Sequence, residues 1–195
     1  GFAIYVPDEH YGNAPGSLAL GEALAKNLNK WNATSTLPIE NYGVVPDQSL
    51  IAIGSNNTAE YASVLVEYAY IYESKIAYPE AREVVTDDFA YQTYKGIEEF
   101  FGNPVLGDYT LALPYVWKVE IVEEGTASPQ IYALQVALHS LGFYPPAGEL
   151  LVGCPVSGYA GECTVRALEA FQASKGLEQT GSIGPRTKAA LEAAG

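Results

Sequence analysis

The stretch CTVRALEAFQASKGL, residues 163–177, decides how the C-terminal third of this chain folds. Thr164 is the expected N-cap of a helix, and Gly176 is the expected stop behind it. Apolar residues recur between them at helical spacing and form one stripe, which contains Val165, Ala167, Leu168, Ala170 and Phe171. A helix with such a stripe needs partners, so the neighbouring sequence should supply them.

Both flanking segments predict such a partner helix. Upstream, Ser128-Pro129 is a start signal. The helix after it presents an apolar face made of Ile131, Leu134, Leu138 and Leu141. Downstream, a glycine-broken turn leads to a helix that opens at Pro185 and turns inward Ala189, Ala190 and Leu191. Short connections between three short helices predict a small all-α bundle.

This bundle resembles the three-helix peptidoglycan-binding domain found in cell-wall hydrolases and other envelope proteins. Three blocks carry the resemblance: LQVALHSLGF at 134–143, GYAGECTVRALEAFQASKGL at 158–177 and TGSIGPRTKAAL at 180–191. The resemblance covers residues 129–194, one third of the chain. It implies a ligand, peptidoglycan or a related wall glycan, and a secreted or cell-surface location.

Two features depart from the family pattern. Ala160 stands where the family usually has an aromatic residue, and the loop 144–157 is longer than usual. Both lie near the side expected to face the glycan. The candidate glycan contacts in this region are Tyr144, Tyr159 and Arg166. The alternative is that the bundle is only a docking or spacer element that binds no polymer.

Two cysteines, Cys154 and Cys163, flank a loop rich in glycine and proline. Such a pair in a small bundle is typical of a local disulfide, which favours an oxidising compartment outside the cytoplasm. A pair of reduced thiols is the alternative. The spacing fits no zinc pattern, because histidine ligands are missing nearby, so we expect no metal.

Charge is distributed unevenly along the chain. The net charge is −13, of which residues 1–126 carry −12 and residues 127–195 carry −1. Nucleic acids and anionic membranes are bound by clusters of Lys and Arg, so we expect neither as a partner. No run of about 20 apolar residues is present, so we expect no membrane insertion. Two triplets permit N-glycosylation, at Asn32 and Asn56.

Residues 1–125 predict an acidic α/β domain, followed by the bundle at 126–195. The expected sheet is small and mainly parallel, with an antiparallel hairpin at its C-terminal end. The expected strands are 2–6, 34–39 and 49–53, with a turn at 46–47 and hairpin strands at 109–113 and 115–122. The expected helices are 17–31, 58–76, 80–85 and 88–101. Residues 49–71 also resemble, over a strand–glycine–helix turn, the α/β domains of surface-layer proteins.

No group of residues in the first domain predicts a catalytic centre or a cofactor. His10 and Glu22 are arranged like part of a zinc-dependent wall amidase. That chemistry needs a second histidine ligand, but the chain's other histidine, His139, lies in the bundle. The sequence therefore does not predict an amidase site. Residues 54–58 precede a predicted helix and permit anion binding, but they lack the phosphate-loop pattern. A glycosidase needs two carboxyl groups that face each other across a cleft. Adjacent acidic residues point in different directions, so we interpret them as surface charge.

The leading hypothesis is therefore a non-catalytic envelope protein. Its bundle attaches to wall glycan or to neighbouring subunits, and its first domain is a surface or assembly module. The 15 tyrosines of the chain are compatible with self-association into a homo-oligomer or repeated assembly. One alternative is a cell-wall hydrolase with residues 1–126 as its catalytic domain. Another is a phage or virion structural protein that uses the bundle for assembly.

Overall fold

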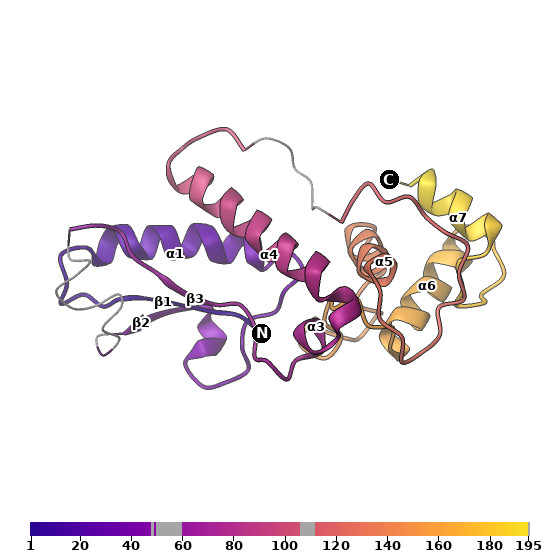
Figure 1. Ribbon diagram of the computed structural model, residues 1–195, viewed down its shortest axis with the longest axis horizontal. Coiled ribbons are helices and arrows are strands. Elements are labelled where there is room, and N and C mark those ends of the chain that lie inside the picture. Colours follow the sequence, from indigo (N-terminus) through magenta and orange to yellow (C-terminus); the bar gives the residue numbers. More distant parts are fainter. Residues whose placement is uncertain (48, 50–59, 106–111, 195) are drawn as a thin grey trace. The chain divides into compact units, whose positions relative to one another are not determined.

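The computed structural model describes residues 1–47, 49, 60–105 and 112–194 (Figure 1). Its contacts divide the chain into two compact units. The sheet unit contains residues 1–70 and 89–108, and the helical unit contains residues 71–88 and 109–195. A small sheet with helices in the first unit and a helical bundle in the second confirm the predicted fold class. The domain boundary between residues 125 and 126 stays a prediction.

The sheet unit is built on a mixed three-stranded sheet with the order β2-β1-β3. The central strand β1 (Ala3–Pro7) pairs in parallel with β2 (Val44–Asp47) and antiparallel with β3 (Leu65–Glu67). Helix α1 (Ala14–Leu28) covers one face. It approaches closely because Gly21 has no side chain: a Cβ there would lie 2.9 Å from Cγ1 of Val6.

The second strand is not the one predicted. Residues 34–39 form no strand, and Thr34 makes only a single parallel bridge to Phe2. Strand β2 instead runs through Pro46 and Asp47, where the sequence predicted a turn. Among the described strands β2 lies at the edge of the sheet, so Pro46 does not interrupt a ladder on both sides, and the β-branched Val44 and Val45 fit the pleat.

The predicted helix 58–76 is wrong over its described part. Residues 65–67 form β3, and helix begins only at the short α3 (Ser74–Ala77). Pairing with β1 outweighs the helical spacing of the tyrosines in this segment, since Leu65 and Val66 suit a strand. The two predicted helices at 80–85 and 88–101 are one continuous helix, α4 (Pro79–Phe100). Most of the predicted strand 49–53 lies outside the described residues.

The helical unit contains the three predicted helices, α5 (Pro129–Ser140), α6 (Glu162–Ser174) and α7 (Pro185–Glu192). Ser128 caps α5 by accepting a hydrogen bond from the Ile131 amide at 3.2 Å. Helix α6 ends as predicted at Gly176, whose φ of +65° favours glycine. The core between these helices is apolar and fully buried, and it includes Ile131, Leu134, Leu138, Leu168 and Phe171.

Several details of the bundle differ from the prediction. Gly161, not Thr164, is the N-cap of α6, and Thr164 lies buried in the first turn. On α6 and α7 the buried faces are narrower than predicted, because positions three and four residues apart bury together while their neighbours do not. Helix α5 is instead buried at every position from 130 to 138. Among the residues predicted to face inward, solvent reaches Leu141, Ala170 and Ala189.

The predicted hairpin is absent from residues 112–122. This segment is extended, and Glu120 forms one isolated antiparallel bridge, with Ile183. The side chain of Gln130 takes the place of a partner strand at Lys118. It accepts a hydrogen bond from the Lys118 amide at 2.7 Å and donates one to the Lys118 carbonyl at 3.2 Å. A side-chain amide therefore satisfies backbone groups that the sequence assigned to a second strand.

Two further glutamines brace the loops of the bundle. Oε1 of Gln135 accepts from the Ser157 and Gly158 amides at 2.8 and 2.9 Å, and Nε2 donates to the Tyr159 carbonyl and to Oγ1 of Thr164, both at 2.8 Å. Gln172 does the same for the next loop. Its Oε1 accepts from the amides of residues 180 and 181 at 2.9 and 3.1 Å, and its Nε2 lies 2.8 Å from the carbonyl of residue 182. Both side chains are fully buried.

We predict that Gln172→Ala lowers the free energy of unfolding by about 2–4 kcal/mol, because two backbone amides lose their acceptor in a buried place. Urea denaturation followed by circular dichroism measures this. Gln179→Ala removes an exposed glutamine from the adjoining segment and should leave the midpoint almost unchanged. Equal midpoints for the two variants would show that the buried amide does not brace the loop.

Candidate functional site: the bundle surface and the sheet cavity

The predicted disulfide is present in the helical unit. It joins Cys154 to Cys163, whose Cα atoms are 5.9 Å apart. The bond ties the loop before α6 to the first turn of that helix. The disulfide holds this loop at Cys154, and the hydrogen bonds from Gln135 hold it at residues 157 and 158.

The three predicted glycan contacts have different environments. Tyr144 is only 4% exposed and donates a hydrogen bond to the Pro155 carbonyl at 2.9 Å. Burial raises the pKa of Tyr144, so it remains a protonated brace of the loop. Tyr159 is half-buried and stacks on Tyr78, with ring centroids 4.6 Å apart and an interplanar angle of 10°.

Arg166 lies on the solvent side of α6 between two carboxylates. Its Nη1 is 3.1 Å from Oε1 of Glu149 and 3.8 Å from Oε1 of Glu162. Only Tyr159 and Arg166 therefore have side-chain atoms open to a polymer. The glycan-binding role of all three residues stays a prediction.

The two predicted glycosylation positions also differ. Asn32 is 2% exposed and its Nδ2 atom is buried, which disfavours attachment of a glycan at that atom. Asn56 lies outside the described residues, as do the glycine turn at 54–58 and the core of the segment that resembles surface-layer domains.

A groove lies on the surface of the helical unit, against α5 and α7. Its cavity has a volume of about 490 Å³, and its walls are mainly apolar. One wall is the extended segment that precedes the bundle, which contributes Pro114, Tyr115 and Trp117. The other walls come from Leu141, Leu191 and Glu192. The sequence signal for this groove is the pair of aromatic residues 115 and 117, which lie in the predicted hairpin strand 115–122.

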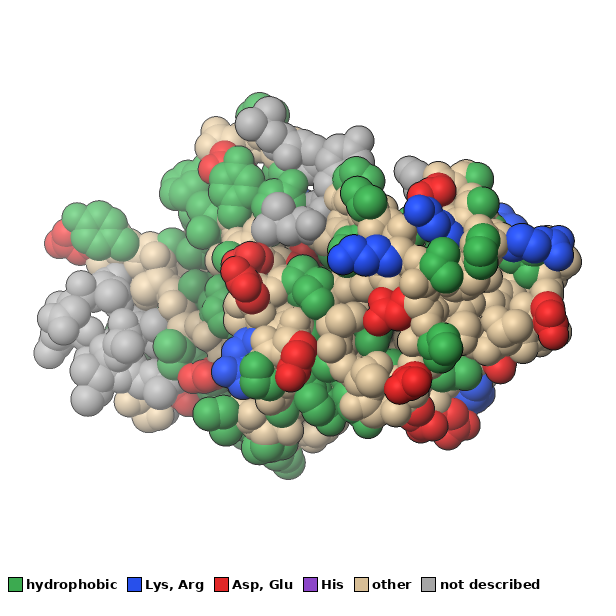
Figure 2. Space-filling view, turned by 45° about the vertical axis from the view of Figure 1, so that its right-hand side comes forward, with side chains coloured by type: hydrophobic (Ala, Val, Ile, Leu, Met, Phe, Trp, Pro, Cys, Tyr) green, Lys and Arg blue, Asp and Glu red, His purple; other side chains and the backbone are tan. Residues whose placement is uncertain are grey.

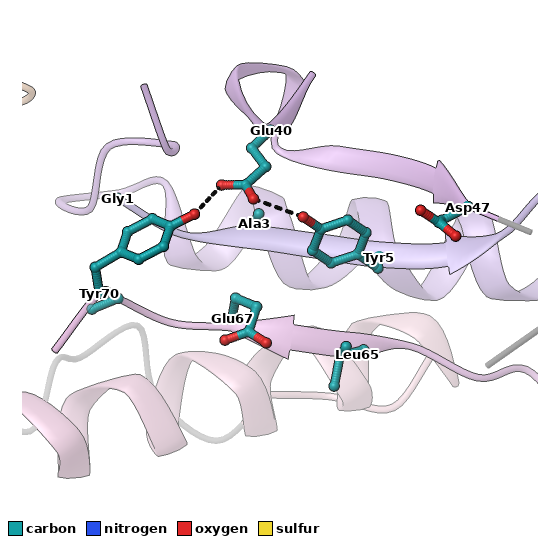
Figure 3. A pocket seen from close by; sticks show the side chains of 9 residues that line it. Gly1, Ala3, Tyr5, Glu40, Asp47, Leu65, Glu67 and Tyr70 are labelled. Carbon is teal, nitrogen blue, oxygen red and sulfur yellow. Dashed lines mark hydrogen bonds between the residues drawn. The ribbon is translucent and has the colours of Figure 1, made fainter. Parts of the chain in front are cut away.

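The second cavity, of about 390 Å³, lies on the sheet face opposite α1. Alternate residues of β1 face opposite sides, so Ile4 and Val6 face the helix and Tyr5 faces the cavity. Figure 3 shows two tyrosine hydroxyls directed at one carboxylate. Tyr5 donates to Oε1 of Glu40 at 2.7 Å, and Tyr70 donates to Oε2 at 2.6 Å. Two more carboxylates line the cavity, from Asp47 and Glu67.

These hydrogen bonds determine how Glu40 and Tyr5 titrate. Burial alone would raise the pKa of Glu40, but hydrogen bonds from Ser35, Tyr70 and Tyr5 outweigh it and hold this pKa below its usual value. The bond to Glu40 raises the pKa of Tyr5 to about 12, with burial as the next cause. Glu40 is therefore an ionised hydrogen-bond acceptor at neutral pH.

His10, the histidine considered for an amidase site, pairs with a neighbouring acidic residue. His10 is exposed, and its Nδ1 lies 3.0 Å from Oδ1 of Asp8. Within residues 1–47, 49, 60–105 and 112–194, no group of three histidine, cysteine or acidic side chains is arranged to hold a metal ion.

Comparison with known proteins concerns the bundle alone. Residues 127–191 match the family model of a putative peptidoglycan binding domain. The matched segment contains all of α5 and α6 and most of α7, and it confirms the family resemblance over one third of the chain. The peptidoglycan-binding-type bundle thus associates this chain with the cell wall. No curated protein and no solved structure is significantly similar to the chain. None of the helices in the described part of the chain has the length and apolar character needed to cross a bilayer.

We predict that thiol titration of the denatured chain detects no thiol before reduction and two after it. Reduction should lower the free energy of unfolding by about 2–3 kcal/mol, because the unfolded chain regains the freedom of the closed loop. The double variant Cys154→Ser with Cys163→Ser is the control, and reductant should not change its stability. Two thiols in the unreduced protein would contradict the disulfide.

We predict that Glu40→Gln returns the pKa of Tyr5 from about 12 toward its ordinary value near 10. The folded pKa is raised, so this bond stabilises the fold fully below pH 10 and the contribution is lost as the pH rises through 12. The difference in tyrosinate absorbance between each protein and its Tyr5→Phe derivative isolates this residue. Glu22→Gln, an exposed change in the same unit, should leave the titration unaltered.

Proposed function

We propose that this chain attaches to the cell wall without catalysing a reaction on it. The helical bundle binds peptidoglycan or a related wall glycan, and the sheet unit is held at the cell surface as a surface or assembly module. The observation that carries the proposal is the match of residues 127–191 to a peptidoglycan-binding family model.

The construction of the bundle supports this role. A rigid surface favours polymer binding, because ordering loops on binding lowers the affinity. Two buried glutamines and one disulfide hold the loops around α6 in place before any ligand is present. A disulfide also suits an oxidising compartment, which supports a secreted or cell-surface location.

The charge of the bundle supports binding of a wall polymer as well. Residues 127–195 carry a net charge of only −1, whereas the rest of the chain is strongly acidic. Figure 2 shows Lys and Arg side chains interspersed with Asp and Glu over the region of α6 and α7. An anionic wall polymer would meet less repulsion on this surface than on the acidic residues 1–126.

The sheet unit supports a role in assembly through its exposed apolar side chains. Ile39 precedes the short helix η1 (Glu40–Tyr42) and Tyr42 is its last residue; the two are 64% and 80% exposed. Exposed apolar groups that lie together are typical of interaction surfaces. We propose a second copy of the chain as the partner of this surface.

One observation favours the alternative of a wall hydrolase. The cavity on the sheet brings together three carboxylates, from Glu40, Asp47 and Glu67. A wall hydrolase that cleaves the glycan with a pair of carboxyl groups needs one carboxyl with a raised pKa as its general acid. The lowered pKa of Glu40 suits a base or nucleophile instead, so an acid would have to come from one of the other two.

We predict that the intact chain sediments with purified insoluble peptidoglycan and releases neither reducing sugars nor free peptides from it. Binding should require the wall polymer itself, so insoluble cellulose at equal mass is the control. Protein in the pellet and supernatant is measured together with the released products.

Recovery of all protein in the supernatant would overturn the attachment. Equal sedimentation with cellulose would show that the binding is not specific for the wall polymer. Product release that disappears in Glu40→Gln would identify the sheet cavity as a catalytic site and the chain as a hydrolase.

A further inference from the structure

We propose that the glycan strand of peptidoglycan lies in the groove that the extended segment 113–120 forms against α5 and α7, with Tyr115 at its centre. This inference rests on the proposed function and names the surface that performs it. The whole segment lies before the family match at 127–191, so the family match alone does not assign this site.

Two adjoining cavities give the groove its length. The apolar cavity has a volume of about 490 Å³, and a polar cavity that shares a lining residue with it has about 380 Å³. Tyr115 lines both. Each volume is in the range of small-ligand pockets, roughly 300–1,000 Å³. Consecutive cavities that share one aromatic residue suit a chain of repeating sugar units better than a single small molecule.

The segment is held firmly before any ligand arrives. The Gln130 side chain makes two hydrogen bonds to the backbone of Lys118, and Glu120 exchanges two backbone hydrogen bonds with Ile183, at 3.0 and 2.9 Å. Trp117 is 4% exposed, and its ring centroid is 5.2 Å from that of Tyr115. Tyr115 is therefore positioned by its neighbours, so little entropy is lost when a ligand contacts it.

The chemistry of the two cavities differs in a way that suits a sugar chain. The first presents the ring of Tyr115 with Pro114 and Leu141, and aromatic rings of this kind pack against the apolar faces of sugars. Among the described residues that line it, the charged one is Glu192, whose Oε1 is 3.6 Å from Nζ of Lys188. The described lining therefore contains a carboxylate and no Lys or Arg, which disfavours the carboxylates of a stem peptide.

The polar cavity of the groove, with a volume of about 380 Å³, offers hydrogen bonds. Its lining includes the charged side chains of Lys118 and Glu120. Ser128 and Gln130 also line it, but they already bond to the backbone of Ile131 and of Lys118. Burial, and next the charge of Glu120, raises the pKa of Tyr115, so its hydroxyl remains protonated and can donate at neutral pH. Hydroxyl and acetamido groups along one edge of a glycan strand would find their partners here, while the apolar faces of its rings cover Tyr115.

The test compares variants of the intact chain for binding to insoluble peptidoglycan. Tyr115→Ala should weaken binding by about tenfold or more, as expected for an aromatic residue at the centre of an interface. Tyr72→Ala removes a tyrosine that is 74% exposed and lines neither cavity, so it should bind like the wild type. Tyr115→Phe should retain most of the affinity, because the ring remains.

A second variant keeps the test informative if Tyr115→Ala fails to fold, which a melting curve would reveal. Leu141→Glu places a charge at the exposed rim of the apolar cavity and should weaken binding by a similar factor. Leu150→Glu makes the same change at an exposed leucine outside both cavities and should bind normally.

Competition identifies the part of the polymer that is bound. Soluble glycan strands freed of stem peptides should displace the wild type from insoluble peptidoglycan, and isolated stem peptides should not. Displacement by stem peptides alone would overturn the assignment of the groove to the glycan.

Failure of the wild type to sediment would refute the proposed function. Sedimentation of the wild type with unchanged binding by folded Tyr115→Ala and Leu141→Glu would refute only the groove.

Discussion

The helical unit depends on buried side-chain amides that bind backbone groups. An amide side chain has two donors and two acceptor positions, and Gln135 and Gln172 each use both sides inside an apolar core. Each glutamine bonds to several backbone groups of a loop, which would otherwise form hydrogen bonds with water. Gln130 extends this to the segment before the bundle. These bonds satisfy the backbone of the loops between three short helices, and Gln130 holds the segment that lines the surface groove.

The sheet unit uses a different polar device. Tyr5 comes from the central strand and Tyr70 from the segment after β3, yet both donate to the single carboxylate of Glu40. The arrangement joins three distant parts of the chain on the sheet face that α1 leaves uncovered. It keeps Glu40 ionised, because neutral donors favour the charged form of a carboxyl group. The cavity between these groups is consequently acidic and polar, unlike the apolar cavity that Leu141 and Leu191 line in the helical unit.

The bundle could be predicted because its signals are local. Capping at Ser128, the stop at Gly176 and the periodic apolar positions determine its helices without reference to the rest of the chain. The sheet could not be predicted as well, because strand choice depends on pairing between distant segments. Leu65–Glu67 has a helical tyrosine pattern around it but becomes a strand through its pairing with β1. The groove was missed for a related reason, since it depends on how Gln130 binds an extended segment that has no partner strand.

Helix α4 has a consequence for the modularity of this chain. The compact unit that holds the bundle also includes residues 71–88, and the boundary between the units falls inside that one helix. Asp88 is fully buried and accepts a hydrogen bond from the Tyr132 hydroxyl at 2.8 Å, and Tyr78 stacks on Tyr159. Gene recombination at a single junction before α5 would transfer the bundle without these two partners. A bundle transferred in this way would therefore have an uncovered flank. A bundle inherited together with α4 would keep both partners.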